Sequence, residues 1–332
     1  ASDYQLRLDP ATAGQYLLTR LSDGLTRSIA DGDTVDGFTL DIGATAGMYY
    51  YMTLFGAQIR HSPQGVPEFL PHPIAATPDL SLLTPFDFHA TGVMPALHRQ
   101  FQAMRQIAQA EYGGQINVGF PGFGRGPLDI YVQLRGYDNF AADTAERPEF
   151  VHQFLAYIVA ERARYRRLRS EFLGEAPAPN PTAGIDDDWV NVPFISPAIF
   201  REFVLPAYRR IQANEGTVNH FHTCGVLVPL VADLLATFPG IKTLDVSGWN
   251  DLGRLDEIVD PAVGFHVSFI NSFVLAGSAR EHREKLACVA RVRRRRTVSA
   301  CAQAIVRLHD DFAEDLRRMN AFIAVAREAL SQ

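Results

Sequence analysis

Short runs of β-forming residues alternate with helical segments along the last two thirds of the chain. From residue 115 onward six predicted strands occur, and a helix, or a loop and a helix, follows each of them. These strands cover residues 115–120, 183–185, 218–224, 241–246, 263–270 and 297–301. Alternation of strands and helices without tandem hairpins indicates parallel strands covered by helices. The sequence therefore predicts an α/β fold.

The first 114 residues are less regular. A strand over residues 37–43 and a helix-like run from Met48 to Met52 precede a proline-rich passage from Ser62 to Pro85. Repeated prolines interrupt helices and strands, so we expect a long surface loop there. From Pro95 to Tyr112 apolar residues recur at helical spacing.

An eight-stranded barrel needs two strands beyond the six, and the N-terminal region is able to supply them. We therefore expect a single (β/α)8 TIM-barrel domain over residues 1–332. Within it, residues 1–114 form the irregular N-terminal region and residues 115–325 the recognisable barrel units. A length of 332 residues with 47% hydrophobic residues is enough for one large core.

Charge and hydropathy limit the partners that we expect. A net charge of -6 gives no reason to expect a nucleic acid, because proteins that follow phosphates are usually basic. The arginine run over residues 291–296 is interpreted as a solvated helix end. The longest apolar stretch, Val226 to Ile241, contains Asp233 and Pro239 and is too short to span a membrane.

The chain contains three cysteines, an odd number, and no segment that looks like a secretion signal. We therefore expect a reducing, cytoplasmic setting. The loop over residues 121–127 has glycines, but their spacing is not G-x-G-x-x-G, and Pro127 argues against the helix start that a dinucleotide site needs. We predict a tight loop over a site that takes no nucleotide.

Side chains suited to catalysis or metal binding lie at the ends of predicted strands. His220, His222 and Cys224 alternate along one strand and so share one face. An imidazole beside a thiol is the beginning of a zinc site, but the same residues also occur as packed core groups. The acids Asp186, Asp187 and Asp188 end another strand, where they either cap a helix or face a polar ligand. Asp245 and Cys301 also lie at strand ends.

Several motifs together resemble the uroporphyrinogen decarboxylase superfamily over roughly residues 115–325. In chain order they are Leu134-Arg135-Gly136, Asp186-Asp187-Asp188-Trp189, Ile195-Ser196-Pro197, Phe200-Arg201-Glu202-Phe203-Val204-Leu205-Pro206 and His222-Thr223-Cys224-Gly225. The chain lacks the M-R-Q-A-G-R-Y motif of the porphyrinogen decarboxylases themselves. It also has Val298-Ser299-Ala300-Cys301-Ala302 in place of their N-L-G-H-G stretch.

The resemblance therefore favours the other branch, the zinc-dependent methyltransferases that exchange a methyl group between a corrinoid and a thiol or a methoxylated small molecule. In that branch H-x-C and a distant cysteine on the last barrel strand hold Zn²⁺, which implies His222, Cys224 and Cys301 as metal ligands here. Asp187 and Asp245 are the predicted catalytic residues, which orient the substrate or handle a proton.

A corrinoid would have to come from a partner protein, because the chain has no D-x-H-x-x-G segment for holding one. Two alternatives stay open at this point. One is a metal-free lyase that resembles uroporphyrinogen decarboxylase. The other is a non-catalytic barrel that binds a corrinoid protein or a small ligand.

Overall fold

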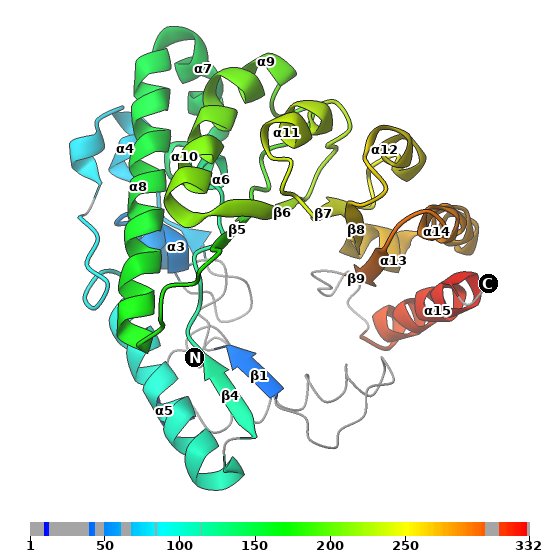
Figure 1. Ribbon diagram of the computed structural model, residues 1–332, viewed down its shortest axis with the longest axis horizontal. Coiled ribbons are helices and arrows are strands. Elements are labelled where there is room, and N and C mark those ends of the chain that lie inside the picture. Colours follow the sequence, from blue (N-terminus) through cyan, green and yellow to red (C-terminus); the bar gives the residue numbers. More distant parts are fainter. Residues whose placement is uncertain are drawn as a thin grey trace. The chain divides into compact units, whose positions relative to one another are not determined.

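The computed structural model describes residues 10–12, 40–43, 50–60, 68–83, 85–113, 115–302 and 312–330 (Figure 1). The chain divides into two compact units. The first comprises residues 1–123, 130–150 and 160–176, and the second comprises residues 124–129, 151–159 and 177–332. Helix α8 (Pro148–Leu173) contributes residues to both units.

The first unit contains one parallel strand pair and several helices. Strand β1 (Leu40–Gly43) pairs in parallel with β4 (Ile116–Gly119), and the two-residue strands β2 (Ile59–Arg60) and β3 (Glu68–Phe69) pair antiparallel. The main helices are α5 (Met94–Tyr112) and α7 (Tyr137–Glu146). Short helical segments complete the unit: η1 (Pro10–Thr12), α3 (Tyr50–Thr53), α4 (Pro73–Ala76) and η2 (Leu80–Leu82).

Predictions for this region are confirmed in part. The expected helix over residues 95–112 is α5, and the described part of the expected strand over residues 37–43 is β1. Residues 37–39 and 48–49 lie outside the described part of the chain. The proline-rich passage is not wholly irregular, because Pro73 occupies the first turn of α4, where a missing backbone N–H costs no helical hydrogen bond.

Arg135, from the Leu-Arg-Gly motif, is a structural residue of the first unit. It is buried, forms an ion pair with Asp143, and donates to the backbone carbonyls of Ile74 and Ala75. Its guanidinium joins three segments of the unit, which accounts for the presence of arginine without a catalytic role.

The second unit is built on a five-stranded parallel sheet in the order β5-β6-β7-β8-β9. The strands are β5 (Thr182–Asp186), β6 (Thr217–Thr223), β7 (Thr243–Ser247), β8 (Gly264–Phe269) and β9 (Val298–Ala302). Together with β4, these are the six strands predicted beyond residue 115. The α/β prediction is confirmed, and the structure describes this sheet without a closed ring of eight strands.

Helices follow the strands in turn, and Figure 1 shows α10, α11, α12 and α14 along one side of the sheet. Their bounds are α10 (Leu205–Glu215), α11 (Val231–Thr237), α12 (Leu252–Ile258), α13 (Asn271–Ala276), α14 (Ala279–Arg293) and α15 (Phe312–Leu330). Apolar residues of the strands, among them Phe221, Leu244 and Val267, are fully buried. The core of this unit therefore lies within its strand and helix layers.

The helix predicted to start at Ser196 has three consecutive parts. Ser196 accepts a hydrogen bond from the backbone N–H of Ile199, as predicted for an N-cap, and α9 (Pro197–Ile199) leads into the π-helical turn η3 (Phe200–Val204) and α10. Pro206 in the first turn of α10 has no N–H to donate to the preceding turn. A widened turn before a proline accommodates the missing hydrogen bond without breaking the helix.

Two sequence interpretations need correction. Pro127 does not prevent a helix start but begins α6 (Pro127–Arg135), since proline is well suited to the first helical position. The arginine run is not entirely a solvated helix end either. Arg296 is buried, whereas Arg294 is exposed.

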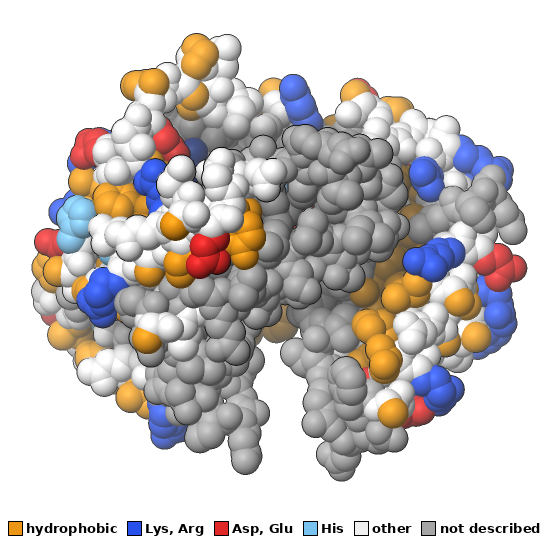
Figure 2. All heavy atoms as spheres, turned by 90° about the horizontal axis from the view of Figure 1, so that it is seen from below, with side chains coloured by type: hydrophobic (Ala, Val, Ile, Leu, Met, Phe, Trp, Pro, Cys, Tyr) orange, Lys and Arg blue, Asp and Glu red, His pale blue; other side chains and the backbone are white. Residues whose placement is uncertain are grey.

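The described surface shows no large gathering of one charge sign on the face drawn in Figure 2. Lys and Arg side chains are scattered there among acidic and uncharged ones. Among the helices that the structure describes, none is both long enough and apolar enough to cross a membrane.

Candidate metal centre

One rung of the five-stranded sheet carries polar side chains from every strand. The register places Asp186 opposite His222, His222 opposite Asp245, Asp245 opposite His266, and His266 opposite Ser299. Residues paired in parallel strands point to the same face and are spaced by about 4.8 Å. The sheet therefore brings side chains from distant parts of the sequence into one row.

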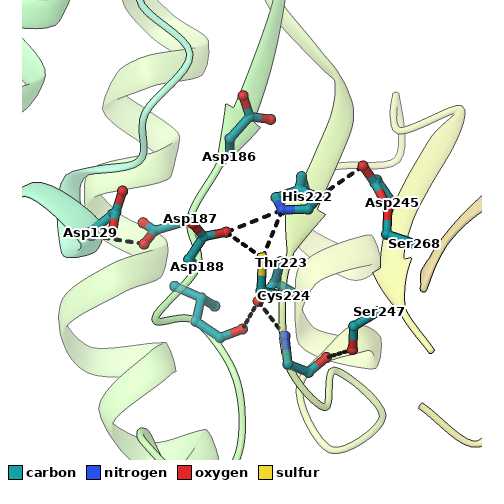
Figure 3. A network of polar contacts seen from close by, with 12 residues as sticks. Asp129, Asp186, Asp187, Asp188, His222, Thr223, Cys224, Asp245, Ser247 and Ser268 are labelled. Atoms are coloured by element: carbon teal, nitrogen blue, oxygen red, sulfur yellow. Dashed lines mark hydrogen bonds and ion pairs between the residues drawn. The ribbon is translucent and has the colours of Figure 1, made fainter. Parts of the chain in front are cut away.

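Three potential metal-binding side chains converge at the end of β6 (Figure 3). His222 Nε2 lies 3.1 Å from Asp188 Oδ1 and 3.3 Å from Cys224 Sγ. The thiol of Cys224 is also 3.0 Å from Asp188 Oδ1. One donor atom from each residue lies within 4.8 Å of the other two.

Asp245 forms an ion pair with the His222 ring. Its Oδ2 lies 2.8 Å from His222 Nδ1, and its Oδ1 accepts a hydrogen bond from Ser268 at 2.8 Å. A carboxylate on Nδ1 leaves Nε2 directed at Asp188 and Cys224. This is the arrangement in which a histidine that binds metal is usually held by a second group.

Arg125 restrains the other side of the centre. Its guanidinium forms ion pairs with Asp129 and Asp188. It lies between Gly124 and Gly126, and a Cβ on Gly126 would come within 2.4 Å of the Asp187 side chain. The glycines therefore allow this loop to pass close to the acidic end of β5.

The charged groups of the centre shift one another's pKa values, so that His222 favours its protonated form and Asp188 its ionised form. Burial lowers the pKa of His222, but Asp188 and Asp245 raise it more strongly, to about 12. Burial raises the pKa of Asp188, but His222 and Arg125 hold it well below its usual range. Burial raises the pKa of the Cys224 thiol. The carboxylates that favour a proton on His222 would also attract a metal cation, which competes with that proton.

The three donor atoms lie slightly closer together than the ligands of a tetrahedral zinc site, so binding zinc would require them to move apart by a few tenths of an ångström. Zinc bonds of about 2.0–2.3 Å to nitrogen, oxygen and sulfur imply separations of about 3.3–3.7 Å between ligand atoms in a tetrahedron. The three separations in this centre are 3.0, 3.1 and 3.3 Å. An imidazole, a thiol and a carboxylate also make a donor set that zinc accepts.

Cys301 does not lie in this group. It lies two residues beyond Ser299 on β9, opposite Ser268, and its Sγ lies 3.2 Å from His266 Nε2. The hydrogen bond with His266 lowers the pKa of the Cys301 thiol, although burial opposes this. Strands β7 and β8 separate it from Cys224, so three strand spacings, roughly 14 Å along the sheet, lie between the two cysteines.

The predicted catalytic acids have different positions. Asp245 contacts His222 as described, but Asp187 is fully buried and faces the start of α6. Asp187 accepts hydrogen bonds from the backbone N–H groups of Leu128 and Asp129 and from the hydroxyl of Tyr208. Burial, and then the nearby Asp129, raise the pKa of Asp187 well above its usual value. These contacts cap the start of α6, and the catalytic role of Asp187 stays a prediction.

Sequence reasoning did not single out Asp188, Arg125 or His266. The three consecutive acids looked equivalent, because β5 ends at Asp186 and strand alternation does not extend into the loop. Arg125 had a detectable signal, since a lone arginine between two glycines follows a predicted strand. His266 had the weaker signal of a histidine in a predicted strand.

Replacing Asp187 with alanine is expected to destabilise the protein by about 2–3 kcal/mol, because two helix N–H groups and the Tyr208 hydroxyl would lose their acceptor. Metal content should stay unchanged. Chemical denaturation and elemental analysis measure the two effects. Asp186→Ala is the matched control, since the Asp186 side chain is 43% exposed. Unchanged stability with lost metal would instead place Asp187 in the centre.

Comparison with known proteins decides the family. The family model described as uroporphyrinogen decarboxylase (URO-D) matches residues 41–265, about two thirds of the chain. This chain belongs to the uroporphyrinogen decarboxylase family. Since the matched residues include Asp188, His222 and Cys224, the candidate metal centre lies within the family region.

A solved structure extends the comparison of the fold beyond the residues that the family model matches. The structure of a methyltransferase from Methanosarcina mazei is similar with a TM-score of 0.61 and 16% sequence identity, covering 92% of this chain and 83% of that chain. At this identity the likeness concerns the fold. No curated protein sequence matches the chain.

Proposed function

We propose that this member of the uroporphyrinogen decarboxylase family is a zinc-dependent methyltransferase. It would move a methyl group between a corrinoid, carried by a partner protein, and a thiol or a methoxylated small molecule. The proposal includes a closed (β/α)8 barrel to which β4 through β9 contribute six strands. The observation that carries it is the convergence of Asp188, His222 and Cys224 on one point.

The proposed zinc ligands are His222, Cys224 and Cys301, with Asp188 beside them. His222 and Cys224 already face one another in the sheet. Cys301 comes from the family resemblance, and its inclusion requires β9 to approach β6. Zinc held by these residues would supply the acidity that turns a substrate thiol into a nucleophile for a methyl group.

The surrounding residues hold this centre in place. Asp245 orients His222 through Nδ1, and Arg125 limits the movement of the Asp188 carboxylate. The loop after Cys224 is anchored by Asn250, whose side-chain amide donates to the Gly225 carbonyl at 2.8 Å. Groups whose rotation is already restricted keep a reacting sulfur and a methyl donor in line, which supplies a large part of the rate.

A metal-free lyase is less well supported. A decarboxylase of this family would need a cationic side chain to hold the carboxylates of its substrate. Arg125 contacts the centre through Asp188, but its charge is already matched by Asp129 and Asp188. The similarity in fold to the Methanosarcina mazei methyltransferase also favours methyl transfer.

The purified protein is expected to contain about one zinc ion per chain, as a single tetrahedral centre would require. Cys301→Ser should weaken zinc retention and abolish transfer from methylcobalamin to a thiol. Cys288→Ser is the matched control, because Cys288 lies in α14 near Arg291, away from the centre. Elemental analysis and the cobalamin absorbance measure the two outcomes.

Different results would change the proposal in different ways. Full zinc content and activity in Cys301→Ser would leave Asp188 as the third ligand. A wild-type protein that transfers methyl groups without zinc would remove the metal from the mechanism. Zinc binding without transfer from any donor would favour the non-catalytic barrel.

A further inference from the structure

Both tryptophans of the chain lie on loops next to the one that carries Cys224. Trp189 follows the end of β5 by three residues, and Trp249 follows the end of β7 by two residues. Strands β5 and β7 are the two neighbours of β6, and Cys224 comes directly after β6. The two loops that carry the tryptophans therefore flank the loop at the candidate metal centre.

Buried asparagines fix both of these loops against Gly225. Asn191 packs so closely that a Cβ on Gly225 would lie 2.0 Å from its side chain. From the other side Asn250, which is fully buried, donates to the Gly225 carbonyl and accepts from the backbone N–H of Leu227 at 2.7 Å. The tryptophans are thus positioned by buried neighbours two residues away or fewer.

Trp249 nevertheless exposes 60% of its surface. Phe194, on the same loop as Trp189, is 41% exposed, and its ring centroid lies 4.7 Å from that of Trp189 in an edge-to-face arrangement. Single exposed aliphatic residues need no explanation, but a large exposed aromatic ring on a loop that contacts Gly225, the residue after Cys224, is suited to a ligand contact.

We propose that Trp189 and Trp249 bind the flat, conjugated body of the substrate on either side of Cys224. This inference rests on the proposed function and adds to it the residues that select the substrate. Uncharged indole rings favour planar conjugated ligands, whose faces they stack against. Both an aromatic methyl ether and the macrocycle of a corrinoid have this chemistry. Stacking would place the methyl group of either one over the strand end at Cys224.

The experiment uses tryptophan fluorescence of the zinc-loaded protein, because the chain has no tryptophan outside this region. The protein is titrated with 4-methoxybenzoate in one series and with methylcobalamin in another, which separates the two sources of ligand. Binding should quench the emission. Trp249→Ala should raise the dissociation constant of the bound probe about tenfold, while Trp249→Phe should retain most of the affinity.

Two controls make the result specific. Ile258→Ala removes an exposed apolar side chain, 40% exposed on α12, and should leave probe affinity unchanged. Because the Trp variants lose part of the fluorescence signal, their bound probe is measured by equilibrium dialysis. Circular dichroism checks folding. Trp189→Phe shows whether the second ring contributes, and an increase in the dissociation constant of about threefold is expected, because Phe keeps part of the stacking.

The inference is overturned if neither probe binds the zinc-loaded protein, or if Trp249→Ala binds both probes as tightly as the wild type. It is also overturned if the quenching comes from self-association that Trp249→Ala abolishes, since the rings would then form a protein interface. A zinc-loaded wild type that binds the probes through Trp249 but transfers no methyl group from any donor would contradict the proposed function alone. Zinc-dependent methyl transfer that is indifferent to both tryptophans would contradict this inference alone.

Discussion

Replacing His222 with alanine is expected to weaken zinc binding on the order of a thousandfold, because a multi-ligand zinc site distributes its binding free energy over few bonds. His222 is the central member of the centre, since it contacts Asp188, Cys224 and Asp245. The rate of methyl transfer should fall to that measured in buffer without the protein. Competition with a chromophoric chelator measures the zinc affinity.

Asp245→Asn provides the graded comparison. The amide keeps the size of the side chain but removes the negative charge from His222 Nδ1, and loss of such a supporting contact typically costs about 10- to 100-fold in metal affinity. The order of affinities should therefore be wild type, Asp245→Asn and then His222→Ala. Equal affinities in all three proteins would show that zinc, if present, binds elsewhere in the chain.

The sheet and part of the centre were predictable because they depend on short-range rules. Runs of β-branched and aromatic residues separated by helical segments predicted β4 through β9. Alternation along a strand placed His222 and Cys224 on one face, and the structure has their donor atoms 3.3 Å apart. The sequence selects Asp245 as a residue near a strand end; the structure places it within β7, opposite His222, and its catalytic role stays a prediction.

The remaining features depend on relations between segments that no local pattern contains. Cys301 lies at a strand end like Cys224, but the number of strands between them sets their separation, and only the sheet order gives that number. Among the three consecutive acids that begin with the last residue of β5, the turn of the loop directs Asp187 toward α6 and Asp188 toward His222. Residue type alone does not distinguish Asp187 from Asp188.

Arg296 illustrates the same limit for stability. In a run of arginines its sequence environment indicates a solvated residue, yet its side chain is 0% exposed. Its guanidinium forms an ion pair with Asp256 and donates to four backbone carbonyls, at Asp256, Val259, Asp260 and Val263. These carbonyls belong to the end of α12 and the segment that leads into β8. The arginine therefore joins a helix end to the start of a strand.

Arg296→Ala is expected to destabilise the protein by about 3–5 kcal/mol, since it would leave the buried Asp256 carboxylate with only Arg295 and would remove the guanidinium donor from four backbone carbonyls, of which Asp260 keeps the N–H of Val263. The loss of the guanidinium from the face of Phe265, where it lies 4.2 Å from the ring centroid, adds to the effect. Arg296→Lys should recover only part of the lost stability, because an ammonium group cannot reproduce the planar arrangement of five N–H donors.

The exposed Arg294 gives the matched control within the same run, and Arg294→Ala should change stability by no more than about 0.5 kcal/mol. Urea denaturation followed by circular dichroism measures all three variants. Because α12 and β8 adjoin β7, which carries Asp245, a destabilised Arg296→Ala protein should also release zinc at lower urea concentration than the wild type. Equal stability of the Arg294 and Arg296 variants would contradict the structural role, since it would mean that the buried carbonyls find other donors.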